Sequence, residues 1–297
     1  MISVVICTRD RAPKLGQCLR HMSEACREPG LAWQVVVVDN ASEDGTKEVI
    51  DRFAECLPLK YAFEARRGLS HARNRGLAEA EYPIIAFTDD DCLVSPDWLR
   101  AIVTEFEKCP ALSILGGRVE LADAGDYPVS IRIHDQPEHV TTAAQILSMM
   151  SGCNMAFRRG VFDQVGLFDA AFGKGKRIGS GEDIDFLYRA LRRGSRIAYT
   201  PHVLVRHAHG RDTAEAVESV THEYVRGRGA FYCKFIGDRQ IAKMAYWEVR
   251  SLLKAWLRLP AGSDSPRVLR SLAAGAMYKF LDGRRDGAAC AANRSTD

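Results

Sequence analysis

Four short apolar runs, each followed by polar residues, constrain the fold of this chain more than any other feature of the sequence. The runs cover residues 2–6, 35–38, 59–63 and 83–87, and all except the weaker run at 59–63 are rich in β-branched residues. After the first run, apolar residues recur at helical spacing, as in Leu15, Cys18, Leu19 and Met22. Such runs are typical of strands buried on both faces, and strands that alternate with helices form parallel βαβ units. The sequence therefore predicts an α/β fold with a mostly parallel sheet flanked by helices.

The pattern weakens and then changes along the rest of the chain. Residues 122–142 carry few periodic apolar residues and are expected to form a loop or excursion. Regular patterning resumes at Asn154 and includes a strand near residues 203–207, whereas the pattern beyond Thr213 is helical. We expect one large domain over residues 1–212, with halves at about 1–115 and 116–212, and a helical extension over 213–297.

Composition and cysteine spacing exclude several classes of protein. The 297 residues are 46% hydrophobic and 27% charged, which is ordinary for a globular chain. The nine cysteines are scattered without a C-x-x-C pair, so we expect reduced thiols rather than a zinc site or a disulfide framework. No uncharged apolar run reaches the roughly 18 residues of a membrane-spanning helix, and the N-terminal residues have no leader pattern. A cytoplasmic protein is the resulting expectation.

Charge is spread unevenly along the chain. From Arg206 onward there are 16 Lys and Arg residues and 10 Asp and Glu residues, a difference of +6, whereas the preceding part has 25 and 28, a difference of −3. A basic tail with interleaved aromatic residues suits peripheral contact with an anionic surface, such as the inner face of a membrane. Packing within the protein or in a homodimer is the alternative. Nucleic acid is not an expected partner, because this charge is modest for a phosphate-binding surface.

Polar side chains follow three of the predicted strands at the point where each strand ends. They are Thr8, Arg9, Asp39, Asn40 and an acidic triplet over residues 89–91. In sheets of this kind the ligand lies beyond the carboxyl ends of the strands. We therefore expect these side chains to converge in one crevice.

The triplet of Asp89, Asp90 and Asp91 predicts either a metal site or an acidic turn. Three adjacent carboxylates repel one another unless a cation or dense hydrogen bonding neutralises them. Mg²⁺ and Mn²⁺ prefer oxygen ligands and usually bridge to substrate phosphates. The alternative is an acidic turn that leads into a helix opening at Ser95.

Two later segments also carry residues suited to chemistry. Glu182 and Asp183 begin a predicted helix, where Ser180 and Asp183 resemble a capping box and either carboxylate could face the crevice as a general base. His207 and His209 have strand spacing, so both could face one side and contact a metal or a phosphate. A structural role is the alternative for each histidine.

Arginines lie near the same predicted edge of the sheet. Their guanidinium groups could pair with phosphate oxygens, although exposed arginines are often only solvated; the residues are Arg9, Arg11, Arg66, Arg67 and Arg73. The chain has no G-x-x-x-x-G-K-[ST] motif and no G-x-G-x-x-G motif after the first strand. A Walker-type NTPase and a Rossmann dehydrogenase are therefore disfavoured.

Six segments, in this order, resemble motifs of the family 2 glycosyltransferases of the GT-A fold. They are the first strand and loop (4–11), VDNASEDGT (38–46), GLSHARNRG (68–76), the acidic triplet (89–91), CNMAFRR (153–159) and the acidic pair at 182–183. The resemblance covers about residues 1–210 and implies a GT-A catalytic domain with a Rossmann-like sheet, a nucleotide half and an acceptor half. The C-terminal third matches no pattern of the family, so the acceptor is left open.

The resemblance also implies roles for individual residues. The nucleotide-binding residues would be Thr8, Arg9, Arg11, Asp39, Arg73, Asp89 and Asp90. A divalent metal, Mn²⁺ or Mg²⁺, would be held by Asp91 and His207. The catalytic base would be Asp183, with Glu182 beside it. The acceptor side would include Gly152, Asn154 and His209.

The implied reaction is inverting transfer of a sugar from a nucleotide diphosphate donor, by default a UDP-sugar, to an acceptor hydroxyl. The metal would act as a Lewis acid and Asp183 as a base, so that an α-linked donor gives a β-linked product. The acceptor could be a glycan, a lipid-linked glycan or a small molecule. Two other functions stay open, a nucleotidyltransferase that makes the nucleotide sugar and a non-catalytic basic module that binds a membrane surface. The nucleotidyltransferase is disfavoured because residues 8–12 contain no glycine.

Overall fold

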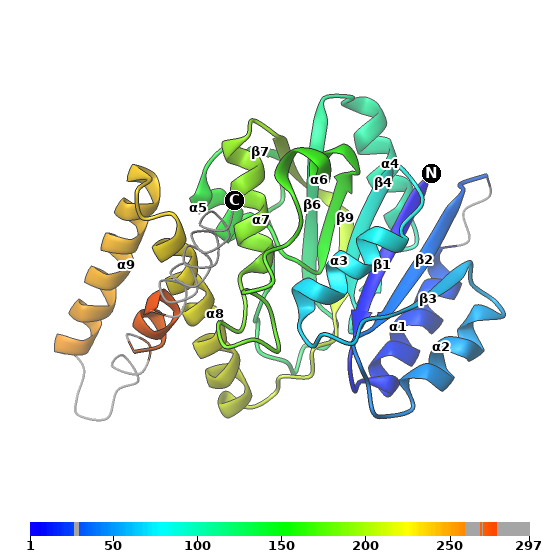
Figure 1. The fold of residues 1–297 in the computed structure, drawn as a ribbon, viewed down its shortest axis with the longest axis horizontal. Coiled ribbons are helices and arrows are strands. Elements are labelled where there is room, and N and C mark those ends of the chain that lie inside the picture. The colour runs from blue at the N-terminus through cyan, green and yellow to red at the C-terminus, as the bar shows by residue number, and fades with distance from the viewer. Residues whose placement is uncertain (27–29, 259–267, 269, 278–297) are drawn as a thin grey trace, which may run out of the picture.

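The computed structural model describes residues 1–26, 30–258, 268 and 270–277, and its core is a nine-stranded sheet with helices on both faces (Figure 1). The strands are β1 (Ile2–Thr8), β2 (Trp33–Asp39), β3 (Leu59–Phe63), β4 (Ile84–Asp89), β5 (Cys92–Val94), β6 (Leu112–Leu121), β7 (Glu138–Val140), β8 (Asn154–Arg158) and β9 (Arg196–His207). The helices are α1 (Ala12–Ala25), α2 (Thr46–Ala54), α3 (Leu69–Glu79), α4 (Trp98–Lys108), α5 (Ala143–Met149), α6 (Gly160–Val165), α7 (Glu182–Arg192), α8 (Ala214–Lys234) and α9 (Arg239–Arg258).

The sheet has a parallel part and a mixed part. Its order is β3-β2-β1-β4-β8-β6-β9-β5, with β7 paired to β9. The first four strands are parallel, whereas β8 runs antiparallel to both of its neighbours, β4 and β6. β6 and β9 are again parallel, and β5 and β7 are antiparallel to β9. The α/β prediction is confirmed, but the parallel geometry predicted for most of the sheet is limited to the first four strands and the β6–β9 pair.

Burial on both faces explains why the first strands are continuous apolar runs. Successive side chains of a strand point to opposite faces of the sheet. Val5 and Val36 belong to one core cluster, which also contains residues of α3 and α5–α9, whereas Val4 and Val35 belong to a second cluster with residues of α1, α2 and α4. The two clusters form the cores of a layered helix–sheet–helix arrangement.

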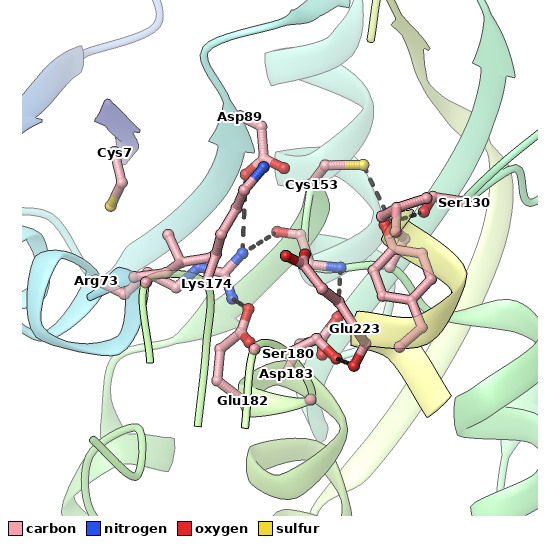
Figure 2. A pocket seen from close by; sticks show the side chains of 18 of the residues that line it. Cys7, Arg73, Asp89, Ser130, Cys153, Lys174, Ser180, Glu182, Asp183 and Glu223 are labelled. Carbon is pink, nitrogen blue, oxygen red and sulfur yellow. Dashed lines mark hydrogen bonds and ion pairs between the residues drawn. The ribbon is translucent and has the colours of Figure 1, made fainter. Parts of the chain in front are cut away.

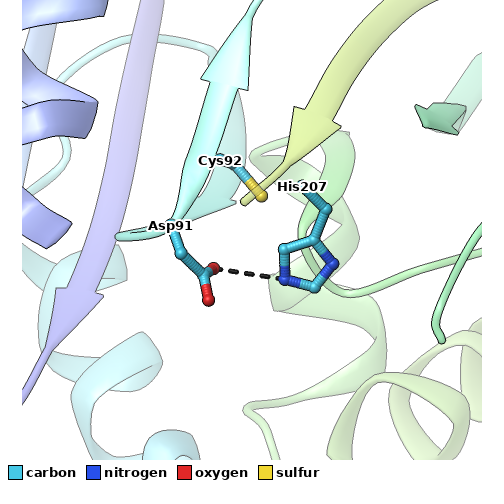
Figure 3. Close-up of side chains that lie close together, drawn as sticks. All are labelled: Asp91, Cys92 and His207. Carbon is cyan, nitrogen blue, oxygen red and sulfur yellow. Dashed lines mark ion pairs between the residues drawn. The ribbon is translucent and has the colours of Figure 1, made fainter. Parts of the chain in front are cut away.

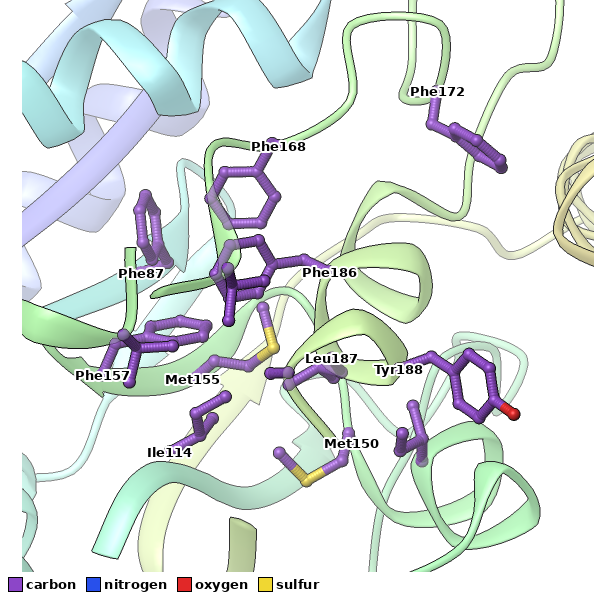
Figure 4. Packing of buried hydrophobic residues seen from close by; sticks show 14 of the residues in the cluster. Phe87, Ile114, Met150, Met155, Phe157, Phe168, Phe172, Phe186, Leu187 and Tyr188 are labelled. Carbon is purple, nitrogen blue, oxygen red and sulfur yellow. The ribbon is translucent and has the colours of Figure 1, made fainter. Parts of the chain in front are cut away.

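Aromatic packing fixes the position of α7 against the sheet (Figure 4). The ring of Phe157 in β8 lies 5.7 Å from that of Phe87 in β4 and 5.5 Å from that of Phe186 in α7, both edge to face. Phe168 lies 4.8 Å from Phe186. Edge-to-face pairs add to the burial energy of the rings. These contacts hold the first turn of α7, with Glu182 and Asp183, over the end of the sheet.

Several local expectations need correction. The helix predicted to open at Ser95 begins at Trp98, with Asp97 as its N-cap residue. The segment predicted as a loop contains β7, and β6 was not predicted because two adjacent glycines interrupt its apolar pattern. Beyond residue 213 the described residues include α8, α9 and a helical stretch over 270–277, whereas residues 259–267, 269 and 278–297 lie outside the described residues. None of the described helices is long and apolar enough to cross a membrane.

Candidate active site

A pocket of about 540 Å³ lies beyond the carboxyl ends of the first strands and brings together most of the predicted site residues (Figure 2). Those that line it are Thr8, Arg9, Arg11, Arg73, Asp89, Asp90, Asp91, Gly152, Glu182, Asp183 and His207. Three predicted residues are not among its lining residues, namely Asp39, Asn154 and His209. The convergence expected from the strand ends is thus present for the first, second and fourth strands, the second through Asn40.

Asp39 lies one residue before the pocket wall. It is buried at the end of β2, and its Oδ1 accepts a hydrogen bond of 2.9 Å from the backbone N–H of Ser42. The next residue, Asn40, lines the pocket, and its Oδ1 accepts from the backbone N–H of Gly68 at 2.8 Å. The second strand therefore reaches the pocket through Asn40, and the nucleotide contact of Asp39 stays a prediction.

Asn154 does not face the acceptor side of the pocket, which corrects its predicted placement. Its Oδ1 accepts from the indole N–H of Trp98 at 2.9 Å, and its Nδ2 donates to the carbonyls of Arg118 and Val203 at 2.9 and 2.8 Å. The side chain is fully engaged and 1% exposed. It ties α4, β6 and β9 together, so its role is structural.

An arginine neutralises part of the acidic triplet. Arg11 Nη1 lies 2.7 Å from Asp90 Oδ1, and Arg11 Nη2 lies 2.5 Å from Asp91 Oδ2. The hydroxyl of Thr8 donates to Asp90 at 2.7 Å. Burial raises the pKa of Asp90 to about 7, although Arg11 opposes the shift. Dense pairing and a cationic partner thus offset the repulsion that the sequence predicts.

Asp91, Cys92 and His207 form the cluster best suited to a metal (Figure 3). Their ligand atoms all lie within 4.8 Å of one another, with Asp91 Oδ1 and His207 Nε2 3.2 Å apart. Within the described part of the chain, His207 Nδ1 is buried without a hydrogen-bond partner, and Asp91 Oδ1 has the contact with His207 Nε2 but no geometric hydrogen bond. Buried polar atoms rarely lack a partner, and a carboxylate oxygen with an imidazole nitrogen is a donor set that Mn²⁺ accepts.

The three candidate ligands differ in how readily they lose the proton that would compete with a metal. Burial opposes the charged form of His207, but the Asp91 carboxylate outweighs burial and raises the pKa of His207 to about 9. A metal would therefore compete with a proton for this imidazole. The hydrogen bond with Cys153 and burial raise the pKa of Cys92 well above its usual value. Since only the thiolate is a good ligand, Asp91 and His207 fit a metal and Cys92 does not.

His209 supports His207 instead of facing an acceptor, which is a second correction. The two rings pack edge to face with centroids 5.0 Å apart. His209 Nδ1 lies 3.2 Å from Asp126 Oδ2, and the side chain has no exposed surface. The two histidine rings are therefore neighbours, as their strand spacing predicts, although β9 itself ends at His207.

Arg73 joins the two halves of the pocket. Its Nη1 donates to Glu182 Oε1 at 2.7 Å, its Nη2 donates to the carbonyl of Gly152 at 3.1 Å, and Asp89 lies 3.8 Å away. The guanidinium is 2% exposed, and Figure 2 shows it between Asp89 and Glu182. Burial raises the pKa of Glu182 to about 7, although Arg73 opposes the shift. Arg73 therefore holds the acceptor half against the nucleotide half through buried polar contacts.

The carboxylate of Asp183 is held by two backbone donors. Its Oδ2 accepts from the N–H of Gly152 at 2.9 Å and its Oδ1 from the N–H of Ile184 at 2.8 Å. A carboxylate accepts about four hydrogen bonds, so further lone pairs are available to a ligand in the pocket. A Cβ atom at Gly152 would lie 2.7 Å from Arg73 Nη2 and 2.9 Å from Asp183 Oδ2. Only glycine leaves room for both side chains.

The predicted capping box at the start of α7 is wrong. The N-cap residue is Gly181 in the left-handed region (φ 91), and it makes no side-chain cap. The hydroxyl of Ser180 instead donates to the carbonyl of Glu223 in α8 at 2.9 Å. The acids of the first turn still lie at the positive end of the helix dipole, which favours their charged forms.

The sequence did not identify the part that α8 plays in the pocket. Val220, Glu223, Tyr224 and Arg228 of this helix line the wall beside Asp183. Arg211 also lines the pocket, and within the described residues its buried Nη1 has no hydrogen-bond partner. The only sequence signal for Arg211 was its place two residues after a candidate histidine.

Comparison with known proteins decides the family. The model of the family described as glycosyl transferase family 2 matches residues 3–166. The chain belongs to this family. Its sheet and flanking helices are those of the GT-A fold, as the resemblance of the six segments predicted.

The chain is similar in sequence to two curated relatives and in fold to one solved structure. Glycosyltransferase AglE of Haloferax volcanii is 28% identical over 211 residues, which cover 68% of this chain and 65% of AglE. The glucosyl-dolichyl phosphate glucuronosyltransferase of the same organism is 24% identical over 221 residues, which cover 69% of this chain and 68% of that relative. The matched part thus spans about two thirds of the length of these curated relatives.

The solved structure supports the fold. Mannosyltransferase PcManGT from Pyrobaculum calidifontis, in complex with GDP-Man and Mn²⁺, is 20% identical and has a TM-score of 0.64. The superposition covers 95% of this chain and 87% of PcManGT. Among the functions that the sequence left open, family membership favours sugar transfer over nucleotide-sugar synthesis and over a binding module.

Proposed function

We propose that this protein is an inverting glycosyltransferase that takes a sugar from a nucleoside diphosphate donor with the help of a divalent metal. The observation that carries the proposal is that Asp183 and the acidic triplet line one pocket from opposite halves of the domain. Family membership supports the sugar transfer. PcManGT, which shares the fold, was solved with GDP-Man and Mn²⁺.

The donor would lie along the ends of the first strands. Thr8, Arg9 and Arg73 line this side of the pocket, with Asn40 at the end of the second strand. We propose UDP as the nucleotide, with Asp39 close to its base. Arg211 offers a buried N–H without a partner within the described residues, which suits a phosphate oxygen of the donor.

The metal would be held by Asp91 and His207, whose buried and convergent ligand atoms motivate this assignment. A divalent cation bound there would offset the negative charge that develops on the leaving diphosphate. Arg11, which pairs with Asp90 and Asp91, would add a second positive charge beside the same diphosphate.

Asp183 would act as the general base. Its two backbone hydrogen bonds fix the carboxylate while leaving lone pairs for an acceptor hydroxyl. As the acceptor oxygen forms its bond to the anomeric carbon, the bond from that carbon to the diphosphate breaks and the hydroxyl proton passes to Asp183. One in-line displacement inverts the anomeric configuration. Glu182 is bound to Arg73, so we assign it to positioning this loop rather than to proton transfer.

The acceptor would approach along α8. We retain residues 1–212 as the proposed catalytic domain, with α8 completing its acceptor wall through Glu223 and Tyr224. A lipid-linked glycan is our preferred acceptor among the three classes that the sequence left open. The relative named as a glucosyl-dolichyl phosphate glucuronosyltransferase supports this choice.

Calorimetric titration tests the donor and metal assignments together. Wild-type protein is titrated with UDP, GDP and dTDP, each with and without Mn²⁺, and the titrations are repeated with Asp91→Ala. Asp163→Ala, which removes an exposed aspartate of α6 outside the pocket, is the matched control. We expect metal-dependent binding of one nucleotide, lost in Asp91→Ala and kept in Asp163→Ala. Absence of binding for all three nucleotides under both conditions would overturn the proposal.

A further inference from the structure

One side of α9 exposes a stripe of aromatic and basic side chains. These residues follow helical spacing and are Lys243, Tyr246, Trp247, Arg250, Leu253 and Lys254, which we call the α9 face. Tyr246 is 57% and Trp247 is 51% exposed. Arg250 lies over the Trp247 ring at 5.0 Å and donates to the Tyr246 hydroxyl at 3.2 Å. Figure 1 shows α9 at the edge of the molecule, away from the sheet.

The α9 face carries positive charge without a balancing acid from its own helix. The sequence of α9 contains one carboxylate, Glu248. Glu248 points to α8, where it lies 2.9 Å from Arg228 and accepts from the Tyr232 hydroxyl at 2.6 Å. The cations on the exposed side, which include Arg239 one turn before the stripe, are exposed and make no ion pair within the described residues. Large exposed aromatic side chains beside uncompensated cations mark an interaction surface.

The chemistry of the α9 face fits an anionic lipid surface better than a second copy of the chain. Trp and Tyr side chains prefer the headgroup level of a bilayer, and Lys and Arg are attracted to anionic lipids. In a two-fold symmetric dimer the same patch would meet itself, so its cations would oppose one another. Lysine is also depleted at the centres of protein–protein interfaces.

We propose that the α9 face docks on an anionic bilayer, with α9 lying in the plane of the membrane surface. The aromatic rings insert among the headgroups while the cations contact lipid phosphates. This is a surface contact, consistent with the absence of a spanning helix among the described residues.

The docking surface is connected to the pocket through one arginine. Arg228 of α8 lines the pocket wall and also bonds to Glu248 of α9. Docking of α9 thus holds the acceptor wall close to the membrane, which suits an acceptor carried by a membrane lipid. This last step rests on the proposed function, whereas the docking itself does not.

Vesicle flotation of the full chain tests the docking. The protein is mixed with vesicles of phosphatidylcholine alone or of phosphatidylcholine with phosphatidylglycerol, at low and high salt. We expect flotation only with the anionic vesicles, and weaker flotation at high salt because the charges are screened. The combined variant Lys243→Glu, Arg250→Glu and Lys254→Glu is expected to lower the partition coefficient by at least about 100-fold, at roughly fivefold for each lost cation. Trp247→Ser is expected to lower it by about tenfold.

A matched charge-reversal control separates docking from nonspecific attraction. Arg20→Glu, Arg52→Glu and Lys108→Glu make the same charge change on exposed positions of α1, α2 and α4. This variant is expected to float almost as the wild type does. Equal loss in both triple variants, flotation with neither vesicle, or a dimer in light scattering that only the α9 substitutions abolish would overturn the proposal. Nucleotide titration in solution, without vesicles, reports separately on the proposed function and on the folding of each variant.

Discussion

The two walls of the pocket are built from the sequence in different ways. The nucleotide wall uses polar residues directly after strands that are neighbours in the sheet, β1, β2 and β4. The acceptor wall combines the loop at Gly152, the first turn of α7 and a side of α8. Its residues meet only through contacts between distant segments, such as Ser180 with Glu223. The first wall is a local consequence of strand ends, whereas the second depends on how separate elements pack.

This difference predicts that the walls can be damaged independently. Substitutions in the acceptor wall should change chemistry and stability while leaving nucleotide affinity intact. Arg73 is the exception, since it bonds to both walls.

The largest effect is expected for Asp183→Asn. Loss of a general base lowers the rate by about a thousandfold, within the usual range for such groups. Nucleotide affinity should stay unchanged, because Asp183 lies on the other wall. The rate of sugar release from the donor and calorimetric nucleotide binding are the two measurements. Glu223→Gln neutralises the neighbouring carboxylate of α8 that also lines the pocket. If Glu223→Gln abolishes turnover and Asp183→Asn does not, the base assignment is wrong.

A large loss of stability is expected for Arg73→Met. Removal of one partner of a buried ion pair costs about 3–5 kcal/mol, because the Glu182 carboxylate then stays buried without its cation. Arg75→Met in the same helix is the control, since Arg75 is half-exposed and pairs with Glu79 at the surface. That substitution should cost less than about 1 kcal/mol. Urea unfolding of both variants measures the difference, and equal costs would contradict the role of Arg73 as a buried link.

A smaller effect is expected for Gly227→Ala in α8. A Cβ atom there would lie 2.3 Å from Ser180 Oγ and 2.7 Å from the Ser180 carbonyl oxygen. The clash would push α8 from the start of α7 at a cost of about 1–3 kcal/mol. Gly237→Ala is the control, because its Cβ would meet no atom within 4 Å. Urea unfolding should separate the two variants, while nucleotide titration should not. Weakened nucleotide binding in Gly227→Ala would argue against independent walls.

The effect of smallest slope is a change in how stability depends on pH. Burial raises the pKa of Glu182 from 4.5 to about 7, so the folded state binds this proton more tightly than the unfolded state does. The resulting stability is fully present below pH 4.5 and is lost as pH rises through about 7. Glu182→Gln should therefore flatten the fall in stability over this window, by at most about 1.4 kcal/mol per pH unit. Urea unfolding at several pH values measures the slope, and an unchanged slope would contradict the buried position of this carboxyl group.

The nucleotide wall could be predicted from the sequence because each of its residues directly follows a strand that its own apolar run identifies. The triplet at Asp89–Asp91 follows a strand whose apolar run marks its own end, so no distant contact is needed to place it. Asn154 was misplaced because its partners, Trp98 and Val203, are 56 and 49 residues away. The capping box predicted from Ser180 and Asp183 was also wrong, because the Ser180 hydroxyl bonds to the carbonyl of Glu223 in α8 instead of capping α7.

The antiparallel direction of β8 could not be predicted from its residues. A strand buried on both faces has the same apolar composition whether its neighbours are parallel or antiparallel. The helical pattern of α8 was visible, but nothing in it distinguished residues that face the pocket from those that pack on the core. The six motifs nevertheless identified the family, because their common order along the chain is more specific than any single motif.

The most direct test of the proposed mechanism is the configuration of the sugar that the protein first releases. Proton NMR follows slow hydrolysis of the α-linked donor selected by calorimetry, with water in place of the unknown acceptor. A single displacement in which Asp183 activates water predicts that the β anomer appears first and that Asp183→Asn suppresses it. Initial release of the α anomer, or of β sugar at the same rate from Asp183→Asn, would contradict the proposed inverting mechanism.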